Sequence, residues 1–139
     1  MTSSPSPDEL RELLKRARTV AVVGLSPKPI RPSHSVARYL QRVGYRIIPV
    51  NPGHDEILGE KSYPTLTAAA RDHVIDVVDV FRRSENAGVV VDEAIALHPQ
   101  LIWLQQGVID PAAQARAVKA GIPFVMDLCL AIEHRNLEV

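Results

Sequence analysis

The sequence predicts an α/β protein in which helices cover both faces of one parallel, doubly wound sheet of five strands. Five short apolar runs alternate with segments whose apolar residues recur at helical spacing. The first run, Thr19 to Leu25, is rich in β-branched residues and continuously apolar, as expected of a strand buried on both faces. Helical crossovers make successive strands parallel and their connections right-handed. These observations predict a three-layer, single-domain fold.

Residues that start or stop regular structure bound each of these segments. The expected strands span 19–25, 46–50, 76–81, 101–104 and 124–126. The expected helices span 8–18, 34–43, part of 63–72, 84–97, 110–121 and a C-terminal piece ending near 137. Gly44 stands where a left-handed residue closes a helix. Thr65 and Ser84 are expected N-caps, and Asp110-Pro111 suits a helix start because proline fits the first turn.

Composition excludes several classes of function. The chain has 139 residues with 16 basic and 16 acidic side chains, so any anion site must be local and we expect no nucleic-acid partner. The apolar runs are far shorter than the roughly 20 residues of a membrane span, so we expect no membrane partner. Cys129 is the single cysteine, too few for a disulfide or a zinc cluster. Residues 1–7 are expected to be a flexible N-terminus and not a secretory signal, so we expect a cytoplasmic domain at 8–139.

The loop after the first strand carries the strongest candidate chemistry, because a doubly wound sheet binds its ligand beyond the carboxyl ends of its strands. Gly24 permits a sharp turn and a close approach to a ligand. The next helix would offer free N–H groups to a phosphate. The side chains before it that could join them are Ser26, Lys28, Arg31 and Ser33. The alternative is that Ser33 only caps the helix and the basic residues are solvated. The full G-x-G-x-x-G pattern is absent.

The loop after the second strand argues against an ordinary NAD-dependent dehydrogenase. An acidic residue there would bind the NAD ribose, whereas this chain has Asn51-Pro52. An NADP site stays open, because Arg82 and Arg83 could serve the ribose phosphate. The five histidines, at positions 34, 54, 73, 98 and 134, show no metal-ligand spacing. We expect them on the surface, and we expect no bound metal.

Three further residues of the expected strands have structural interpretations. Trp103 lies inside the fourth strand and is expected in the core. Asp76 and Asp79 alternate with valines, and we expect them to cap helices or to form hydrogen bonds at the edge of the sheet.

Six segments in order along the chain carry a family pattern: Val20 to Pro27, Ile48 to Pro52, Ile57 to Glu60, Val78 to Arg83, Trp103 to Gly107, and Met126 to His134. They resemble the stand-alone CoA-binding domain family, which is similar in fold to the CoA-binding domain of the succinyl-CoA synthetase alpha subunit. The resemblance covers 19–137 and implies a Rossmann-like sheet that holds coenzyme A at its carboxyl edge. It does not imply the synthetase reaction, because that enzyme's phosphohistidine and ATP-grasp domains have no counterpart here.

The resemblance assigns ligand contacts to the loops after the strands. The assigned residues are Gly24, Leu25, Ser26, Ser33, Asn51, Pro52, Phe81, Arg82, Arg83, Gln105, Gly107 and Cys129. The Gly24 to Ser26 loop and Ser33 would meet the pyrophosphate, and Asn51-Pro52 would flank the adenosine half. Phe81 to Arg83 would form one wall of the site, and its two arginine side chains would extend toward a phosphate. Gln105 and Gly107 would border the pantetheine arm.

Cys129 would lie near the thiol end of the ligand. The family usually has a basic residue just before this cysteine, where this chain has Leu128. A charge that favours the thiolate is therefore missing. A buried, unreactive cysteine at a strand end is the alternative.

Three hypotheses of function remain from the sequence. The first is a small-molecule binding protein for CoA or acyl-CoA, without catalysis of its own, acting as carrier, sensor or regulator. The second is an NAD(P)-binding oxidoreductase-like protein, which would need a proton donor that the sequence does not reveal. The third is a subunit of an acyl-CoA ligase assembly. The sequence leaves the formation of a homodimer open.

Overall fold

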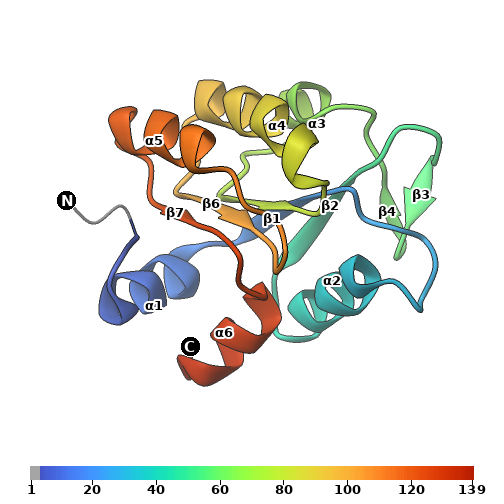
Figure 1. The fold of residues 1–139 in the computed structure, drawn as a ribbon. Helices are drawn as coiled ribbons and strands as arrows, with labels where there is room; N and C mark the ends of the chain where they lie inside the picture. Colours follow the sequence, from blue (N-terminus) through green and yellow to red (C-terminus); the bar gives the residue numbers. More distant parts are fainter. Residues whose placement is uncertain (1–3) are drawn as a thin grey trace.

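A computed structural model describes residues 4–139, which form three layers with a parallel sheet in the middle (Figure 1). The five strands of this sheet are β1 (Thr19–Val23), β2 (Arg46–Val50), β5 (Val77–Val80), β6 (Leu101–Leu104) and β7 (Phe124–Val125). Their order is β2-β1-β5-β6-β7, and every neighbouring pair is parallel. The predicted doubly wound α/β fold is confirmed.

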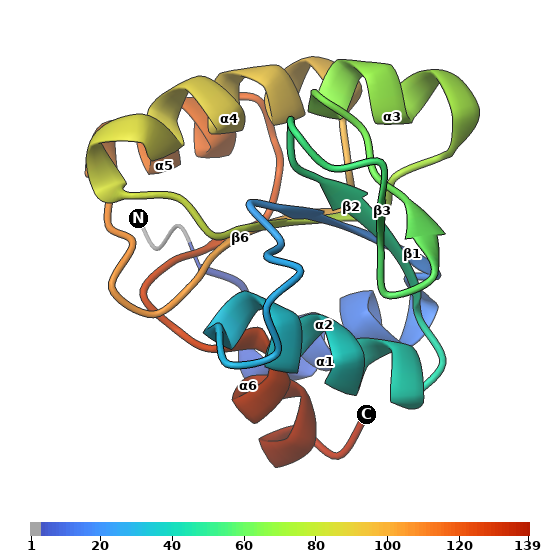
Figure 2. The same cartoon turned by 90° about the vertical axis from the view of Figure 1, so that its right-hand side faces the viewer.

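Helices cover both faces of the sheet (Figure 2). The helices of the described chain are α1 (Pro7–Arg16), α2 (Pro32–Arg42), α3 (Leu66–Asp72), α4 (Ser84–Leu97), α5 (Pro111–Lys119) and α6 (Leu130–Asn136). One apolar core joins α3, α4 and α5 to the sheet, and a second joins α1, α2 and α6 to its other face. Trp103 is fully buried in the second core, as predicted, and its Nε1 donates to the carbonyl oxygen of Leu128 at 2.8 Å.

Several predicted helix ends are confirmed and others are shifted. Gly44 follows α2 with φ 106°, and the Thr65 hydroxyl accepts from the N–H of Ala68 at the start of α3. The first helix begins at Pro7 because Ser6 and Glu9 form a capping box. Of the predicted flexible segment 1–7, residues 1–3 lie outside the described residues.

The prediction that Ser84 caps α4 is wrong, because the N-cap is Arg83 and its side chain makes no capping bond. The Ser84 hydroxyl instead joins the loop after β6. It donates to the carbonyl oxygen of Gly107 at 3.3 Å and accepts from the N–H of Ile109 at 2.9 Å. The Ser84 hydroxyl therefore binds a loop that is distant in the sequence, although the local sequence predicts it as the cap of α4.

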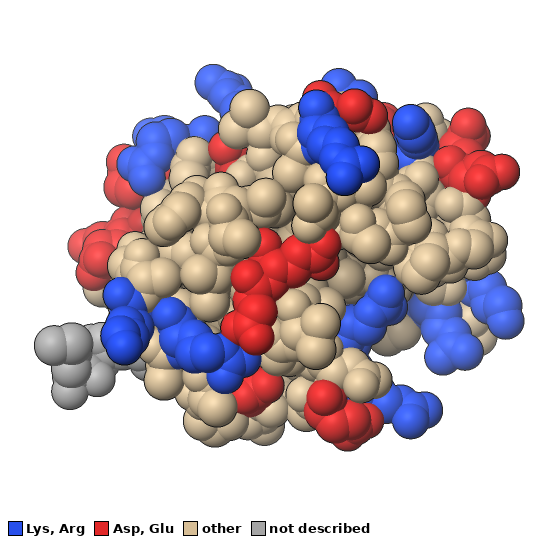
Figure 3. All heavy atoms as spheres, turned by 90° about the horizontal axis from the view of Figure 1, so that it is seen from above, with Lys and Arg blue, Asp and Glu red and all other residues tan. Residues whose placement is uncertain are grey.

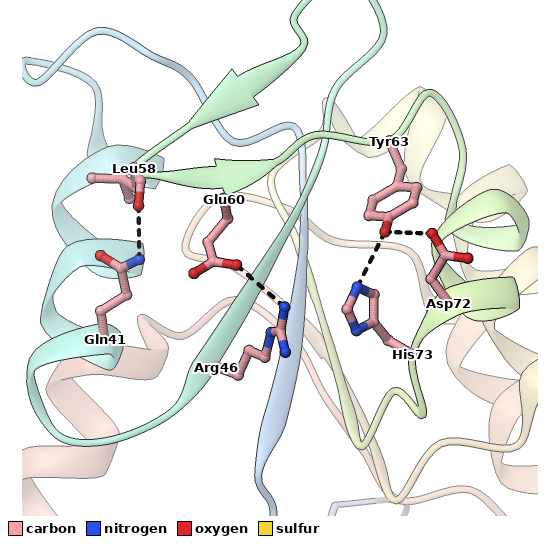
Figure 4. Close-up of polar contacts among 7 residues, drawn as sticks. All are labelled: Gln41, Arg46, Leu58, Glu60, Tyr63, Asp72 and His73. Atoms are coloured by element: carbon pink, nitrogen blue, oxygen red, sulfur yellow. Dashed lines mark hydrogen bonds and ion pairs between the residues drawn. The ribbon is translucent and has the colours of Figure 1, made fainter.

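A small antiparallel hairpin follows β2, and the sequence did not predict it. Its strands are β3 (Glu56–Ile57) and β4 (Glu60–Lys61), and both turn residues, Leu58 and Gly59, have positive φ. Gln41 of α2 donates to the carbonyl oxygen of Leu58 at 3.1 Å, as Figure 4 shows. Arg46 of β2 pairs with Glu60 at 3.6 Å. Two-residue strands have no readable periodicity, so tertiary contacts define the hairpin: these two polar contacts and the burial of Ile57 in the second core.

The described surface has mixed charge. In Figure 3, Lys and Arg are interspersed with Asp and Glu over the face formed by α3, α4 and α5. Among residues 4–139 no helix is long and apolar enough to cross a bilayer.

Candidate functional site

One cleft lies over the carboxyl edge of the sheet, where strand order reverses between β1 and β5. Its volume of about 730 Å³ lies within the range of small-molecule sites. We call it the edge cleft. The predicted site residues that line it are Gly24, Ser26, Lys28, Arg31, Ser33, Asn51, Phe81, Arg82, Arg83, Gln105 and Cys129.

Three predicted residues do not line the edge cleft. Leu25 is fully buried in the core beneath α1, α2 and α6. Pro52 is exposed beside the cleft wall. Gly107 is exposed and turns the loop after β6 with φ 86°, while its N–H donates to Asp127 Oδ1 at 2.8 Å. Leu25 and Gly107 therefore support the loops that form the site.

Six lining residues are not among the predicted site residues: Pro27, Pro32, Val36, His54, Gln106 and Val108. Both prolines and Gln106 are next to predicted site residues in the sequence, so their loop positions could have identified them as lining residues. No such feature of the sequence pointed to His54. It lies between β2 and the hairpin, and the hairpin itself was not predicted.

Gly24 makes the close approach of two loops possible. Its φ is 90°, and a Cβ at this position would lie 2.1 Å from the carbonyl oxygen of Phe81. The same Cβ would lie 2.7 Å from Nη1 of Arg82. A guanidinium group therefore lies directly against the glycine turn, at the reversal point of the sheet.

The loop between β1 and α2 is held by its own hydrogen bonds. The Ser33 hydroxyl accepts from the N–H of Ser26 at 3.0 Å, and the Ser26 hydroxyl accepts from the N–H of Lys28 at 3.1 Å. Asn51 donates its amide to the carbonyl oxygen of Leu25 at 2.8 Å. Ser33 does not cap α2, whose N-cap is Arg31. Its hydroxyl accepts from Ser26 and donates to no group among residues 4–139, so its proton is available to a ligand. The loop is organised before any ligand arrives.

All charged side chains that line the edge cleft are positive. They belong to Lys28, Arg31, Arg82 and Arg83, and no carboxylate occurs among the described lining residues. None of the four cations forms an ion pair within residues 4–139. Helices α2 and α4 begin at the cleft without a side-chain cap, so their first N–H groups add positive potential. In a chain with no net charge, this combination favours a ligand with several negative charges.

The far end of the edge cleft is neutral. Val108 and Cys129 line it beyond Gln105, after β6 and β7. Asp127, in the left-handed conformation with φ 63°, accepts the Gly107 N–H described above, and the carbonyl of the next residue accepts from Trp103. These contacts hold the backbone just before Cys129, whose half-buried side chain is a free thiol.

Asp79 lies beneath the floor of the cleft, in the central strand and not at the edge of the sheet as predicted. It is fully buried, and its Oδ1 accepts from Nε2 of Gln105 at 2.6 Å. Its Oδ2 is sealed from solvent and has no partner among the described residues. Burial raises the pKa of Asp79 to about 7, and the hydrogen bond from Gln105 acts in the opposite direction. Asp76 behaves as predicted, because it accepts from backbone N–H groups where β1 begins.

Two histidines contradict the expected surface positions. His34 is buried, with Nδ1 3.0 Å from the carbonyl oxygen of Ser26, and so supports the loop. His134 is buried with Nδ1 2.8 Å from the Tyr39 hydroxyl, and burial lowers its pKa. Residues 4–139 contain no group of three or more His, Cys, Asp or Glu side chains that could hold a metal ion.

A polar cluster outside the cleft is structural. The Tyr63 hydroxyl donates to Asp72 Oδ2 at 2.7 Å and lies 3.1 Å from Nε2 of His73 (Figure 4). Tyr63 is buried in the core on the α3 side. The cluster therefore joins the segment after the hairpin to the end of α3.

Comparisons with known proteins agree with this fold. Residues 18–135 match the model of the family described as CoA binding domain. YneT of Bacillus subtilis (strain 168) is 42% identical over 131 residues, 94% of this chain and 96% of that protein. A solved structure from Thermus thermophilus, cell-free ID.343, is 40% identical with a TM-score of 0.90, covering 96% of this chain and 99% of that one. A hypothetical protein from Pyrococcus horikoshii OT3 is 34% identical with a TM-score of 0.92, covering 99% and 95%.

A more distant match shows the fold alone. The dinucleotide forming acetyl-coenzyme A synthetase 1 of Ca. Korarchaeum cryptofilum is 23% identical with a TM-score of 0.70. The match covers 81% of this chain but 26% of that much longer one.

Proposed function

Because the chain belongs to the CoA-binding domain family, we propose that it binds coenzyme A, free or acylated, in the edge cleft. One observation carries the proposal: the order of chemical groups along the carboxyl edge matches their order along the ligand. Coenzyme A has an adenosine with a ribose phosphate, then a pyrophosphate, then a neutral pantetheine arm with two amides, and finally a thiol.

The edge cleft presents partners in that sequence from β2 to β7. The polar side chains of Asn51 and His54 lie after β2, where the adenosine would lie. The cations cluster after β1 and β5, around the glycine turn, where the phosphates would lie. Neutral Gln105, Val108 and Cys129 follow after β6 and β7, where the arm and the thiol would lie. Strands lie about 4.8 Å apart, so the path from β1 to β7 is about 14 Å long.

The phosphate contacts follow from the same geometry. The N-terminus of α2, the Ser33 hydroxyl and Arg82 all face the glycine turn region of the cleft. Backbone N–H groups at a helix start and an arginine fork are both suited to phosphate oxygens. Lys28 and Arg31 would supply further positive charge from the exposed rim.

We propose binding without chemistry, in a carrier, sensor or regulator. Acid–base catalysis would need a donor and an acceptor within reach of the same ligand atom. The described lining offers His54 at one end and Cys129 at the other, with no carboxylate between them.

Calorimetric titration with CoA, NAD, NADP and ATP tests the proposal. We expect CoA to bind at least ten times more tightly than NAD, which corresponds to about 1.4 kcal/mol or more. The physical reason is that NAD lacks both the third phosphate and the long neutral arm. Equal affinities for CoA and NAD would contradict the proposal. Tighter binding of NADP than of CoA would favour the oxidoreductase-like alternative.

A further inference from the structure

A buried carboxylate beneath the edge cleft has no role in the contacts described so far. Asp79 pairs in register with Val22 of β1 and Trp103 of β6, which are both fully buried. Burying a carboxylate among apolar neighbours is unfavourable unless hydrogen bonds compensate it. Within residues 4–139, its one hydrogen-bond partner is the side chain of Gln105. That side chain belongs to the ligand cleft.

The contact fixes which end of the Gln105 amide faces the cleft. Above pH 7 the Asp79 carboxylate is ionised and only accepts hydrogen bonds, so Nε2 is the amide atom that faces Oδ1, at 2.6 Å. The backbone of Gln105 is also fixed, because its N–H donates to Val80 and its carbonyl accepts from Val108. Oε1 has no hydrogen-bond partner among residues 4–139, and it is not one of the sealed polar atoms.

We infer that Asp79 is a positioning residue that ties down Nε2 of Gln105, so that the cleft presents the acceptor Oε1 to an amide N–H of the pantetheine arm. This inference rests on the proposed function. Phe81, Val36 and Val108, which also line the cleft, have apolar side chains, and the neighbouring Gln106 is exposed. An amide N–H that is buried against these apolar side chains would lose its bond to water and, without Gln105, would gain no buried acceptor. Gln105 therefore selects an arm that carries a donor.

The test compares CoA with two analogues, each with one pantetheine amide N–H replaced by an ester oxygen. Above pH 7, where Asp79 is ionised, calorimetry on the wild-type protein should show one analogue binding about three- to tenfold more weakly than CoA, as expected for the loss of one neutral hydrogen bond. Gln105→Met removes the acceptor with little change in volume and should abolish that discrimination. Asp79→Leu frees Nε2 to turn toward the cleft, so this variant should discriminate between CoA and the analogue much less strongly. Asp79→Asn keeps an acceptor for Nε2, so it should discriminate as the wild type does.

A second measurement needs no variant and so does not depend on the folding of Asp79→Leu. In the wild-type protein, nuclear magnetic resonance should find a Gln105 Nε2 proton protected from exchange both before and after CoA is added. Loss of protection on binding would overturn the inference, because the amide would then have turned. Discrimination that persists in Gln105→Met would also overturn it. Tight CoA binding with no discrimination in the wild type overturns this inference alone, whereas absence of CoA binding overturns the proposed function.

Discussion

Arg82 shows how the position of one side chain depends on its neighbours. Its guanidinium lies beside Gly24, because a Cβ on that glycine would come within 2.7 Å of Nη1. Arg83, next in the chain, is exposed and serves as the N-cap residue of α4. Two adjacent arginines that look equivalent in sequence therefore differ in structure: the first is fixed at the glycine turn, and the second lies at the rim.

We predict that Arg82→Ala weakens CoA binding about 10- to 100-fold, as expected for a charge-assisted phosphate contact of about 1.5–3 kcal/mol. Arg83→Ala should weaken binding to a smaller but measurable extent. Thermal stability should change little in either case, since neither side chain forms an ion pair within the described chain. Calorimetry and thermal melts measure the two effects. Arg71→Ala, an exposed change on α3, is the control. Unchanged affinity in both cleft variants would mean that these arginines are merely solvated.

Gly24→Ala should destabilise the fold more than Gly44→Ala. Both glycines have positive φ, 90° and 106°, so alanine is strained at each by about 1–2 kcal/mol. A Cβ at position 44 meets nothing within 4 Å, whereas at position 24 it meets the Phe81 carbonyl. That overlap should add about 1–3 kcal/mol. Urea unfolding of the two variants gives the difference directly, and equal losses would refute the close approach of the two loops.

Helices and loops at the carboxyl edge place the reactive groups of the site. Helices α1, α3 and α5 have side-chain caps at Ser6, Thr65 and Asp110, whereas α2, α4 and α6 have none and begin at the cleft. Their first N–H groups are left for a ligand. At the other end, the segment before α6 is held by two hydrogen bonds, one through Asp127 and one to Trp103.

That fixed segment leads to a prediction for Cys129. Exposure to the symmetrical disulfide of CoA should give a mixed disulfide, in which the Cys129 thiolate attacks one sulfur and releases one CoA thiol. The reaction should be slow, because Leu128 stands where a charge would favour the thiolate. Mass spectrometry should find an adduct of CoA mass that a reductant removes and that Cys129→Ser lacks. Desulfo-CoA should protect better than NADP. If CoA binds but no adduct forms, the placement of the arm is wrong and the binding proposal stands.

The stability of the whole molecule should depend on pH through two buried groups with opposite signs. Asp79 has a pKa raised to about 7, so between about pH 4 and pH 7 the folded state holds a proton that the unfolded state releases. Its contribution therefore stabilises at low pH and declines as pH rises through that window. His134 has a lowered pKa, so its contribution is lost as pH falls below about 6.5.

Comparison with Asp79→Asn separates the two contributions. Relative to this variant, the free energy of unfolding of the wild type should fall by at most about 1.4 kcal/mol per pH unit from pH 4 to pH 7, then level off. Urea unfolding across that range measures the slope. His134 is present in both proteins and cancels. A flat difference would mean that Asp79 titrates normally in the folded protein.

The fold itself was predictable from local pattern. Strands buried on both faces must be continuously apolar, so runs such as Arg46 to Val50 are visible in the sequence, and that strand has the predicted bounds. Most residues that line the edge cleft were predictable for a related reason, because parallel strands bring their carboxyl ends to one edge. Gly44 and Thr65 were also identified correctly, since capping preferences act over a few residues.

The remaining features depend on contacts between residues far apart in the chain, and no local pattern records them. The hairpin that follows His54 is held by Gln41 and Arg46 from other elements, and His54 lines the cleft. Ser84 serves a distant loop instead of its own helix. Asp79 lies at an ordinary strand position, and only its alignment with the neighbouring strand brings Gln105 within hydrogen-bond reach. Short-range preferences thus set the elements, while the packing of those elements decides which polar groups meet at the site.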